Sequence, residues 1–422
     1  MGRRILMLAG WYFPDFLGGT ETYVHLLSKQ LQALGWEVLI AAPSVDEKQA
    51  HYIHDGLEVF RYPVTLKPTK AEIRGKVIPE YFAIFKNWLI KNKPDIVHMH
   101  SYTRGCGFYH AQCIKELKIP LVLTLHTMEL ICLRGEMMHW GSFPCDGKVE
   151  ELKCLSCYLQ KRWHLFPLFA KVIALVDWDL RRWFKLREAQ VEKLFNFADR
   201  VVVVSKWLYE LMAKEKFSAK VSLSLHGVPA DFADEKTPAD FKCPKVLRFG
   251  FIGRFNYVKG AHIIIKAIKR LPKDLTVELK LYGRTNTAEE KRYLEYLKRL
   301  AKDDKRIVFL GEVEEKNRKE VFDSFDILLV PSLWFETGPY VVLEAFSAKK
   351  PVIGSRLGGI KDLVTDKVNG LLVEPVDISA WKRTIKWAAE NPSVIKDWVQ
   401  NIPYVRTTKE VLEDMLKIYN AL

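Results

Sequence analysis

The chain has 422 residues, 49% of them hydrophobic, and carries a formal net charge of +14. This size accommodates two ordinary domains, each with its own core. Residues 1–229 hold 31 Lys and Arg against 23 Asp and Glu, and the remaining residues hold 34 against 28, so the positive charge is spread along the chain. Without a basic tail or block, no nucleic-acid partner is expected, and an anionic substrate or membrane surface fits better.

The first apolar run, residues 3–10, is too short for a signal peptide and leads directly into aromatic residues and proline. We expect it to form the first core strand. No apolar stretch approaches the roughly 20 residues that cross a bilayer. These features predict a cytoplasmic protein, either soluble or peripheral at the inner face of the membrane.

Apolar strands alternate with amphipathic helices through the first half of the chain, which predicts a parallel sheet with helices on both faces. The expected strands are residues 3–10, 37–43, 95–100, 121–126 and 200–205, with a helix over residues 21–35. Gly18 and Gly19 lie between the first strand and this helix. Their backbone N–H groups can approach a phosphate or an acceptor, or they can form a simple turn with Thr20 as the helix N-cap.

Two histidines stand at predicted strand ends. His126 ends the sequence LVLTLH, and His100 ends DIVHMH. Ligands of open α/β sheets bind at the carboxyl ends of strands, so these side chains are candidates for a binding site, although a single histidine is more often structural. His100 is expected on the side of the binding site that holds a second substrate, the acceptor. His226 is expected in a turn.

Four of the seven cysteines, Cys132, Cys145, Cys154 and Cys157, follow the spacing C-x12-C-x8-C-x2-C in a predicted insertion over about residues 132–157. A Cys-x2-Cys pair suits tetrahedral zinc, and a reducing cytoplasm disfavours disulfides. The spacing therefore suits a structural zinc site, and a redox-sensitive or purely structural cysteine cluster is the alternative.

The next segment, residues 158–186, mixes aromatic, aliphatic and basic residues. One interpretation is a helical pair whose apolar faces pack on the core, and periodicity alone does not separate it from an interfacial surface that meets anionic lipid. The side chains expected at a membrane in the second interpretation are Arg181, Arg182, Lys185, Arg187, Trp163, Phe166, Phe169 and Trp183.

A polar, proline-punctuated stretch over residues 230–244 predicts a linker between a first domain, residues 1–229, and a second, residues 245–403. The second series of expected strands covers residues 246–254, 277–283, 306–311, 326–332, 351–355 and 370–375, with a helix over residues 261–270. An amphipathic helix over residues 407–419 ends the sequence.

Two cations lie near the start of the second domain. Arg254 follows its first strand, and Lys259 precedes the next helix, in the sequence GRFNYVKG. At these places two cations can neutralise a leaving diphosphate without a metal. The alternative is a pair of solvated surface charges.

Glu336 and Glu344 stand eight residues apart in FETGPYVVLE, after the apolar run 327–330. With Pro339 at the first helical position, one carboxylate lies in a loop and the other about a turn into a helix. A helix N-terminus suits an anionic diphosphate, and the carboxylates can accept hydrogen bonds from sugar hydroxyls. Solvated surface carboxylates are the alternative.

The stretch PSLWFETGPYVVLEAFSAKKPVIGSRLGG, residues 331–359, resembles the donor-binding signature of the retaining glycosyltransferases of family four, and GRFNYVKG resembles their diphosphate-binding motif. The resemblance extends over nearly the whole chain, with GGTE, the strand-end His, GRxxxxKG and E-x7-E in family order. It implies the GT-B fold: two Rossmann-like α/β domains with doubly wound parallel sheets facing a cleft. It also implies a final helix, about residues 404–422, that crosses back to the first domain.

The resemblance also implies roles for individual residues. Glu336 and His126 would contact the donor sugar, Glu344 the ribose, and Arg254 and Lys259 the diphosphate. Further implied donor-binding residues are Gly18, Gly19, Gly253, Gly338, Pro339 and Tyr340. The family commonly has Gly three residues after the first Glu, where this chain has Pro339; proline has no N–H, so one phosphate donor is missing.

We therefore expect a retaining hexosyltransferase that uses a UDP- or GDP-linked sugar and needs no metal for catalysis. Its acceptor would be a saccharide or a lipid-linked molecule in cell-surface glycan or glycolipid synthesis. A GT-B phosphorylase or a sugar-nucleotide epimerase shares the architecture and remains an alternative. A non-enzymatic lipid-surface scaffold is disfavoured because both cations and both carboxylates are present.

Overall fold

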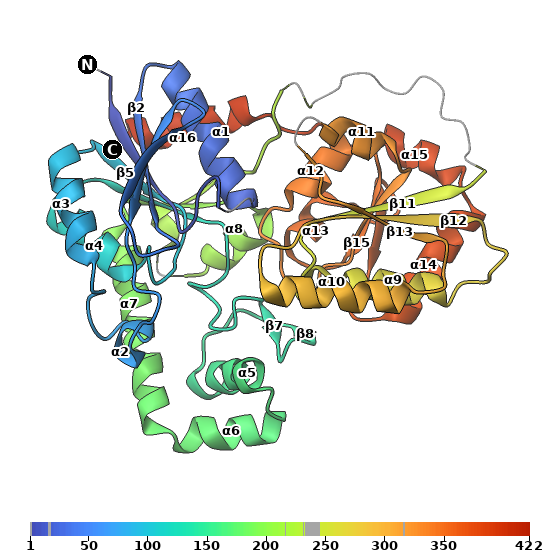
Figure 1. Cartoon of the computed structure of the whole chain (residues 1–422), viewed down its shortest axis with the longest axis horizontal. Coiled ribbons are helices and arrows are strands. Elements are labelled where there is room, and N and C mark those ends of the chain that lie inside the picture. Colours follow the sequence, from blue (N-terminus) through green and yellow to red (C-terminus); the bar gives the residue numbers. More distant parts are fainter. Residues whose placement is uncertain (1, 16–17, 216, 231, 233–244, 315–316) are drawn as a thin grey trace. The chain divides into compact units, whose positions relative to one another are not determined.

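The computed structural model describes residues 2–15, 18–215, 217–230, 232, 245–314 and 317–422. The chain divides into two compact units, Met1–His226 with Thr408–Leu422 (unit 1) and Gly227–Thr407 (unit 2), which are labelled by element in Figure 1. The sequence predicts that the first domain ends at residue 229 and that the C-terminal helix begins at about residue 404. Apart from Ala230 and Phe232, the predicted linker over residues 230–244 lies outside the described residues.

Unit 1 is built on an eight-stranded sheet in the order β10-β9-β6-β5-β1-β2-β4-β3. Its strands are β1 Arg4–Leu8, β2 Glu37–Pro43, β3 Ala50–His54, β4 Leu57–Tyr62, β5 Ile96–Met99, β6 Leu121–Leu125, β9 Arg200–Val203 and β10 Val221–Leu223. Neighbouring strands are parallel except β3 and β4, which run antiparallel. The parallel α/β sheet expected from the sequence is confirmed.

The helices of unit 1 are α1 Gly19–Ala33, α2 Lys70–Ile73, α3 Phe82–Asn92, α4 Phe108–Glu116, α5 Glu151–Trp163, α6 Pro167–Val176, α7 Trp178–Phe197, α8 Lys206–Met212 and α16 Thr408–Asn420, with the short 3-10 helix η1 Ser218–Lys220. The C-terminal helix α16 packs in unit 1. The Tyr419 hydroxyl lies 2.6 Å from Nδ1 of His98, and Gln30 Nε2 donates to Thr408 Oγ1 at 2.9 Å. The last helix therefore belongs to the first unit, as expected.

An insertion between β6 and β9 carries the small hairpin β7 Met138–His139 and β8 Phe143–Pro144, followed by α5, α6 and α7. In Figure 1, α6 lies at the lower edge of unit 1, on the side of α5 away from the sheet. Apolar side chains of all three helices form one small core, with Leu155 and Leu159 from α5 and Leu180 and Phe184 from α7. The core interpretation of this segment is thus correct for α5 and α7.

Unit 2 is a six-stranded parallel sheet in the order β13-β12-β11-β14-β15-β16. Its strands are β11 Leu247–Ile252, β12 Val277–Tyr282, β13 Ile307–Gly311, β14 Ile327–Val330, β15 Val352–Ser355 and β16 Gly370–Val373. Its helices are η2 Tyr257–Lys259 (3-10), α9 Ala261–Lys269, α10 Ala288–Ala301, α11 Arg318–Asp323, α12 Tyr340–Ser347, α13 Gly358–Leu363, α14 Ile378–Glu390 and α15 Val394–Gln400.

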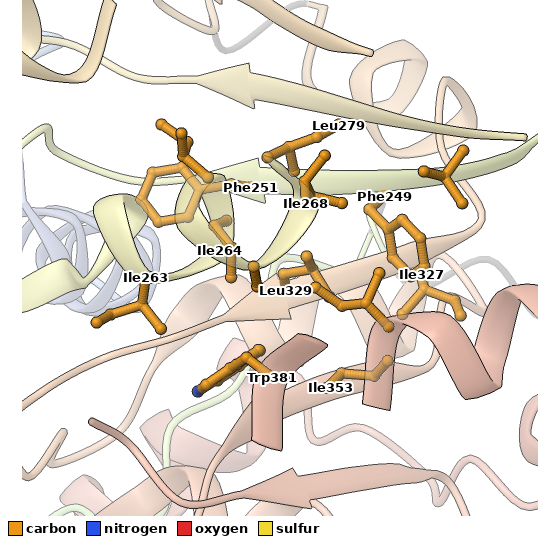
Figure 2. Packing of buried hydrophobic residues seen from close by; sticks show 14 of the residues in the cluster. Phe249, Phe251, Ile263, Ile264, Ile268, Leu279, Ile327, Leu329, Ile353 and Trp381 are labelled. Carbon is orange, nitrogen blue, oxygen red and sulfur yellow. The ribbon is translucent and has the colours of Figure 1, made fainter. Parts of the chain in front are cut away.

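One core cluster of unit 2 lies between this sheet and helices α9 and α14 (Figure 2), and a second contains side chains of α11, α12 and α13. Ile264 and Ile268, four residues apart on α9, are fully buried, and Trp381 of α14 packs in the same cluster as Phe249 of β11. Residues four apart share one face of a helix, so the isoleucine-rich sequence of α9 directs this helix onto the sheet. Each such buried side chain contributes roughly 1.5–3 kcal/mol to stability.

The strand order of unit 2 fixes where a ligand can bind. β11 lies between β12 and β14, so the chain leaves β11 for one side of the sheet and later returns on the other. At such a switch point the helices after the two central strands, here α9 after β11 and α12 after β14, pack in different core clusters, and ligands of open α/β sheets bind at the carboxyl ends of these strands. Among the described residues, no helix is both long and apolar enough to span a bilayer.

Candidate functional site

The loops that follow β11 and β14 touch each other in unit 2. The backbone N–H of Leu333 donates to the carbonyl oxygen of Val258 at 2.7 Å. Gly260 has a φ of +74°, and a Cβ at this position would lie 1.9 Å from the carbonyl oxygen of Pro331. Only glycine fits such a backbone without strain, so the Lys259-Gly260 turn is locked against the loop that carries Glu336.

The carboxylate of Glu336 is buried and receives three hydrogen bonds on one oxygen. Lys259 Nζ lies 2.6 Å from Oε1, Ser332 Oγ 2.8 Å and Trp334 Nε1 2.9 Å. The Lys259 ammonium also lies 5.4 Å from the centre of the Trp334 ring. Lys259 and Glu336, predicted separately from two motifs 77 residues apart, therefore form one charged pair at the switch point.

Burial raises the pKa of Glu336, and this is the largest single influence on it. The Lys259 charge and the hydrogen bonds from Lys259, Trp334 and Ser332 together outweigh it, so the pKa ends below its ordinary value of 4.5. Glu336 is therefore an anion at neutral pH. It presents a fixed acceptor to a hydroxyl group and fixes the position of the Lys259 ammonium.

Glu344, the second carboxylate of the motif, lies on α12 and is buried. Arg318 of α11 pairs with it. Arg318 Nε donates to Oε1 and Nη2 donates to Oε2, both at 2.7 Å. Such a bidentate pair holds the carboxylate in one orientation. Sequence reasoning missed Arg318, because it lies 26 residues before Glu344 in a segment without a motif.

Arg254 and Gly253 follow β11 as predicted. The Arg254 guanidinium is partly exposed and lies 3.8 Å from Oε1 of Glu290, which caps the start of α10. A Cβ on Gly253 would meet only the Phe251 ring, at 3.5 Å, so this site tolerates a side chain. Glycine is instead required at Gly283, which follows the neighbouring strand β12, because a Cβ there would lie 2.1 Å from the carbonyl oxygen of Gly253.

The residues between the two carboxylates form the start of α12. The structure makes Pro339 the N-cap residue, with a φ of −71°, and Tyr340 the first helical residue, with Gly338 just before them. The expectation of Pro339 at the first helical position is wrong by one residue, because the ψ of 101° at Pro339 is extended rather than helical. The loop is further held by Gly359, whose N–H donates to the Glu336 carbonyl at 2.7 Å.

In unit 1, histidines from three strand ends gather around Tyr23 of α1. His100 Nδ1 lies 3.2 Å from His126 Nε2, and the rings of His126 and His226 stack with centroids 5.7 Å apart. The Tyr23 ring lies 4.8 Å from that of His126. His100 and His126 thus lie together as expected, whereas His226, expected in a turn, is buried in the same cluster.

Burial sets the charge of these histidines. Desolvation lowers the pKa of His126 well below 6.5, and the neighbouring His100 and His226 lower it further. The pKa of His100 is lowered by burial and by His98. His126 is therefore neutral at physiological pH and contributes hydrogen bonds rather than charge.

The glycine pair of unit 1 opens α1. Gly18 is the N-cap, with an extended backbone, and its carbonyl accepts the N–H of Thr22 at 3.0 Å. Thr20 lies inside the helix and is not the cap. A Cβ on Gly18 would lie 2.7 Å from Oε2 of Glu21, so glycine leaves room for this buried carboxylate.

The four insertion cysteines lie around the β7–β8 hairpin and α5, and none of them forms a disulfide. Burial is the main cause that raises the pKa of Cys145, Cys154 and Cys157, with that of Cys154 raised to about 11, and the neighbouring Cys132 acts in the same direction. Among the residues that the structure describes, no group of three or more His, Cys, Asp or Glu side chains is arranged as a metal site. A zinc site therefore stays a prediction from ligand spacing.

We expect purified protein to contain close to one zinc per chain, because Cys-x2-Cys with two further cysteines matches a four-thiolate ligand set. Elemental analysis measures this directly. Cys154→Ser with Cys157→Ser should lose the metal, while Cys113→Ser, in α4 outside the insertion, should keep it. Absence of metal, with four titratable thiols in the folded protein, would exclude zinc.

Comparison with known proteins identifies the family of the chain. Residues 17–232 match the family model described as Glycosyltransferase Family 4, and residues 235–403 match the model described as Glycosyl transferases group 1. A D-inositol 3-phosphate glycosyltransferase of Xylanimonas cellulosilytica is 30% identical over 379 residues, which cover 86% of this chain and 81% of the relative. A GDP-mannose-dependent alpha-mannosyltransferase of Corynebacterium glutamicum is 24% identical and covers 92% and 80%.

Solved structures agree on the fold. Sucrose-phosphate synthase of Thermosynechococcus elongatus superposes with a TM-score of 0.72 at 18% identity and covers 99% of this chain and 98% of that protein. The Anabaena protein HepE, in complex with UDP-glucose, gives 0.66 at 16% identity and covers 99% and 100%. With both halves matched in order, the chain belongs to the group 1 glycosyltransferases of the GT-B fold.

Proposed function

We propose that this protein is a retaining hexosyltransferase that moves a hexose from a UDP- or GDP-linked donor to a saccharide or lipid-linked acceptor. The observation that carries the proposal is the ion pair between Lys259 and the buried Glu336, with an Nζ to Oε1 distance of 2.6 Å, at the switch point of the second sheet. A cation and a hydroxyl acceptor held side by side match the two chemical parts of a nucleotide sugar. The diphosphate needs positive charge, and the sugar hydroxyls need acceptors.

The charges of the site support this chemistry. The sugar C1–O bond to the diphosphate breaks, and the acceptor oxygen forms a new bond to C1 on the same face, while its proton passes to the leaving phosphate oxygen. Lys259 and Arg254 would stabilise the diphosphate as its negative charge grows. Glu336 would hold a sugar hydroxyl, and neutral His126 would orient the sugar by hydrogen bonding.

Glu344 would hold the ribose of the donor. Arg318 fixes its carboxylate through two hydrogen bonds of 2.7 Å and leaves each oxygen a further lone pair for a hydroxyl. Ribose does not change during the transfer, so this contact would be equally strong before and during the reaction. It therefore contributes to donor affinity rather than to turnover.

Relatives support a nucleotide-sugar donor and leave its base open. One relative is named as dependent on GDP-mannose, and one similar structure contains UDP-glucose. These names suit the proposed UDP or GDP donor. The acceptor is proposed from the resemblance to enzymes of cell-surface glycan and glycolipid synthesis, and no catalytic metal is required because Arg254 and Lys259 supply positive charge.

Two other enzymes share this architecture and predict different products. A phosphorylase would form a sugar phosphate from a saccharide and inorganic phosphate, and an epimerase would alter a nucleotide sugar without an acceptor. Retaining transfer instead releases a nucleoside diphosphate and keeps the anomeric configuration of the sugar. Product analysis by NMR separates the three.

The donor is identified by a thermal-shift screen of the whole chain with UDP, GDP and ADP sugars. We expect a UDP or GDP sugar to raise the melting temperature, because a ligand at a hundred times its Kd adds about 2.7 kcal/mol of stability. Glu344→Ala should reduce this shift relative to its own unliganded melting temperature. Glu374→Ala, which removes another glutamate 3.5 Å from an arginine in unit 2, should not.

The proposal is wrong if no nucleotide or nucleotide sugar shifts the transition at millimolar concentration. A shift with inorganic phosphate and a sugar phosphate, but with no nucleotide, would favour the phosphorylase.

A further inference from the structure

Helix α6 presents its large apolar side chains to solvent and its small ones to the protein. Ala170 and Ala174 are fully buried against α5 and α7, in the cluster with Leu159 and Phe184. The exposed residues, with their exposed fractions, are Phe166 77%, Leu168 70%, Phe169 62%, Val172 52%, Leu175 54% and Val176 62%. A helix at the surface of a soluble protein normally turns its large apolar side chains toward the core, whereas α6 exposes a contiguous apolar face.

Tryptophans stand just outside both ends of this helix. Trp163 ends α5 and Trp178 begins α7, and both side chains are more than half exposed. Exposed tryptophan at the ends of an apolar helix is typical of segments that lie at the boundary of water and lipid, because the indole is apolar with one polar N–H. The two residues therefore mark the level at which the apolar face would meet headgroups.

The charge around this face is positive. Residues 158–186 contain six Lys and Arg against two Asp and Glu. Arg162 and Arg182 are exposed and form no ion pair within the described part of the chain. One of the two acids, Asp179, is surrounded by Lys70, Arg74 and Lys76. An apolar face bordered by free cations is complementary to an anionic lipid surface.

The structure also corrects the residues expected at a membrane. Arg187 is buried and donates to the backbone carbonyls of Glu129 and Leu130, so it does not meet headgroups. Arg181 pairs with Glu151, and Trp183 packs on Tyr158 at 5.3 Å. The surface is thus α6 with Trp163 and Trp178, named here the α6 face, bordered by Arg162, Arg182 and Lys185.

We propose that the α6 face docks the protein on an anionic bilayer, with the apolar side chains of α6 entering the acyl boundary and Arg162, Arg182 and Lys185 contacting headgroups. A second copy of the chain would also cover an apolar face, but the cations bordering α6 would then face the same cations of the other copy, because a two-fold contact brings the same patch together. Anionic lipid satisfies both the apolar area and the charge.

The test is co-sedimentation of the full chain with phosphatidylcholine vesicles, with and without phosphatidylglycerol. We expect binding to the anionic vesicles at low salt and weaker binding as salt rises, because salt screens exposed charges. Phe169→Asp should weaken binding about tenfold or more, since it places a charge in the apolar boundary. The matched control is Ile53→Asp in β3, an apolar residue of the same unit that is also more than 60% exposed (Ile53 75%, Phe169 62%).

A second pair of variants tests the charge. Arg162→Glu with Arg182→Glu should abolish the preference for anionic lipid, while Lys91→Glu with Lys118→Glu, exposed cations elsewhere in unit 1, should leave it unchanged. All four exposed sites keep the fold intact, which circular dichroism verifies. Absent binding at low salt, binding unaffected by Phe169→Asp, or a dimer in solution that Phe169→Asp dissociates would each overturn the proposal. The donor-induced thermal shift is independent of these outcomes.

Discussion

Lys259→Ala and Glu336→Gln should each lower the rate of glycosyl transfer by about a hundredfold or more. Lys259 is expected to meet the diphosphate charge that grows as the sugar leaves, and losing one such contact typically has an effect of this size. Glu336→Gln removes the charge that holds the Lys259 ammonium and replaces one acceptor oxygen of the carboxylate with an NH2 donor. Both effects act at the reacting end of the donor, so kcat should fall more than donor KM rises.

The measurement is steady-state transfer with the donor identified by thermal shift. Lys273→Ala is the matched control, because it removes an exposed lysine 3.5 Å from Asp304 in the same unit, while the buried Asp304 keeps its 2.8 Å pair with Arg306. An exposed lysine contributes little through such a pair, about 0–1 kcal/mol, so this variant should keep its activity. Near wild-type turnover in both Lys259→Ala and Glu336→Gln would place the reaction elsewhere.

The lowered pKa of Glu336 sets the direction of the pH effect on this pair. A carboxyl whose pKa is lower in the folded than in the unfolded state stabilises the fold above its ordinary value of 4.5. That contribution is lost as the pH falls below 4.5 and through the lower folded value. Around neutral pH Glu336 therefore stays ionised, so its titration is not the source of any pH dependence of transfer there.

Motif order predicted which residues of unit 2 meet, but not what holds them. Glu336 and Lys259 were found from their motifs, since both follow central strands of a parallel sheet and such loops are neighbours. Ser332 and Trp334 complete the carboxylate site, and a sequence pattern gives them no more weight than any serine or tryptophan near a strand end. Arg318 was missed for the same reason, because its partner lies across the fold.

The remaining differences between the sequence-based expectations and the structure arise from burial, which a local sequence pattern does not determine. His226 was expected in a turn because LHGVP resembles a segment where the family has Asn-Gly-Val, yet its ring packs on His126 inside unit 1. The segment over residues 158–186 contains apolar residues on every side of its helices. Which of them are covered depends on α5 and α7 meeting Ala170 and Ala174, a tertiary contact that periodicity does not specify.

Gly260→Ala should destabilise unit 2 by about 2–5 kcal/mol and reduce transfer strongly. Its φ of +74° costs a non-glycine residue about 1–2 kcal/mol. The added Cβ would also lie 1.9 Å from the carbonyl oxygen of Pro331, and relieving such an overlap costs a further 1–3 kcal/mol or so. The overlap is relieved by moving the loop after β14, which would separate Lys259 from Glu336.

Gly311→Ala shows the backbone strain alone, so the difference between the two variants measures the cost of the overlap with Pro331. Gly311 has a similar φ of +78° in the same unit, and an added Cβ would meet nothing within 4 Å. It should lose only the 1–2 kcal/mol or so of backbone strain and keep its activity. Urea denaturation of both variants, followed by transfer assays under conditions where each is folded, gives the comparison. Equal losses of stability would mean that the loop after β14 yields freely, so that contact with the Gly260 turn does not position Glu336.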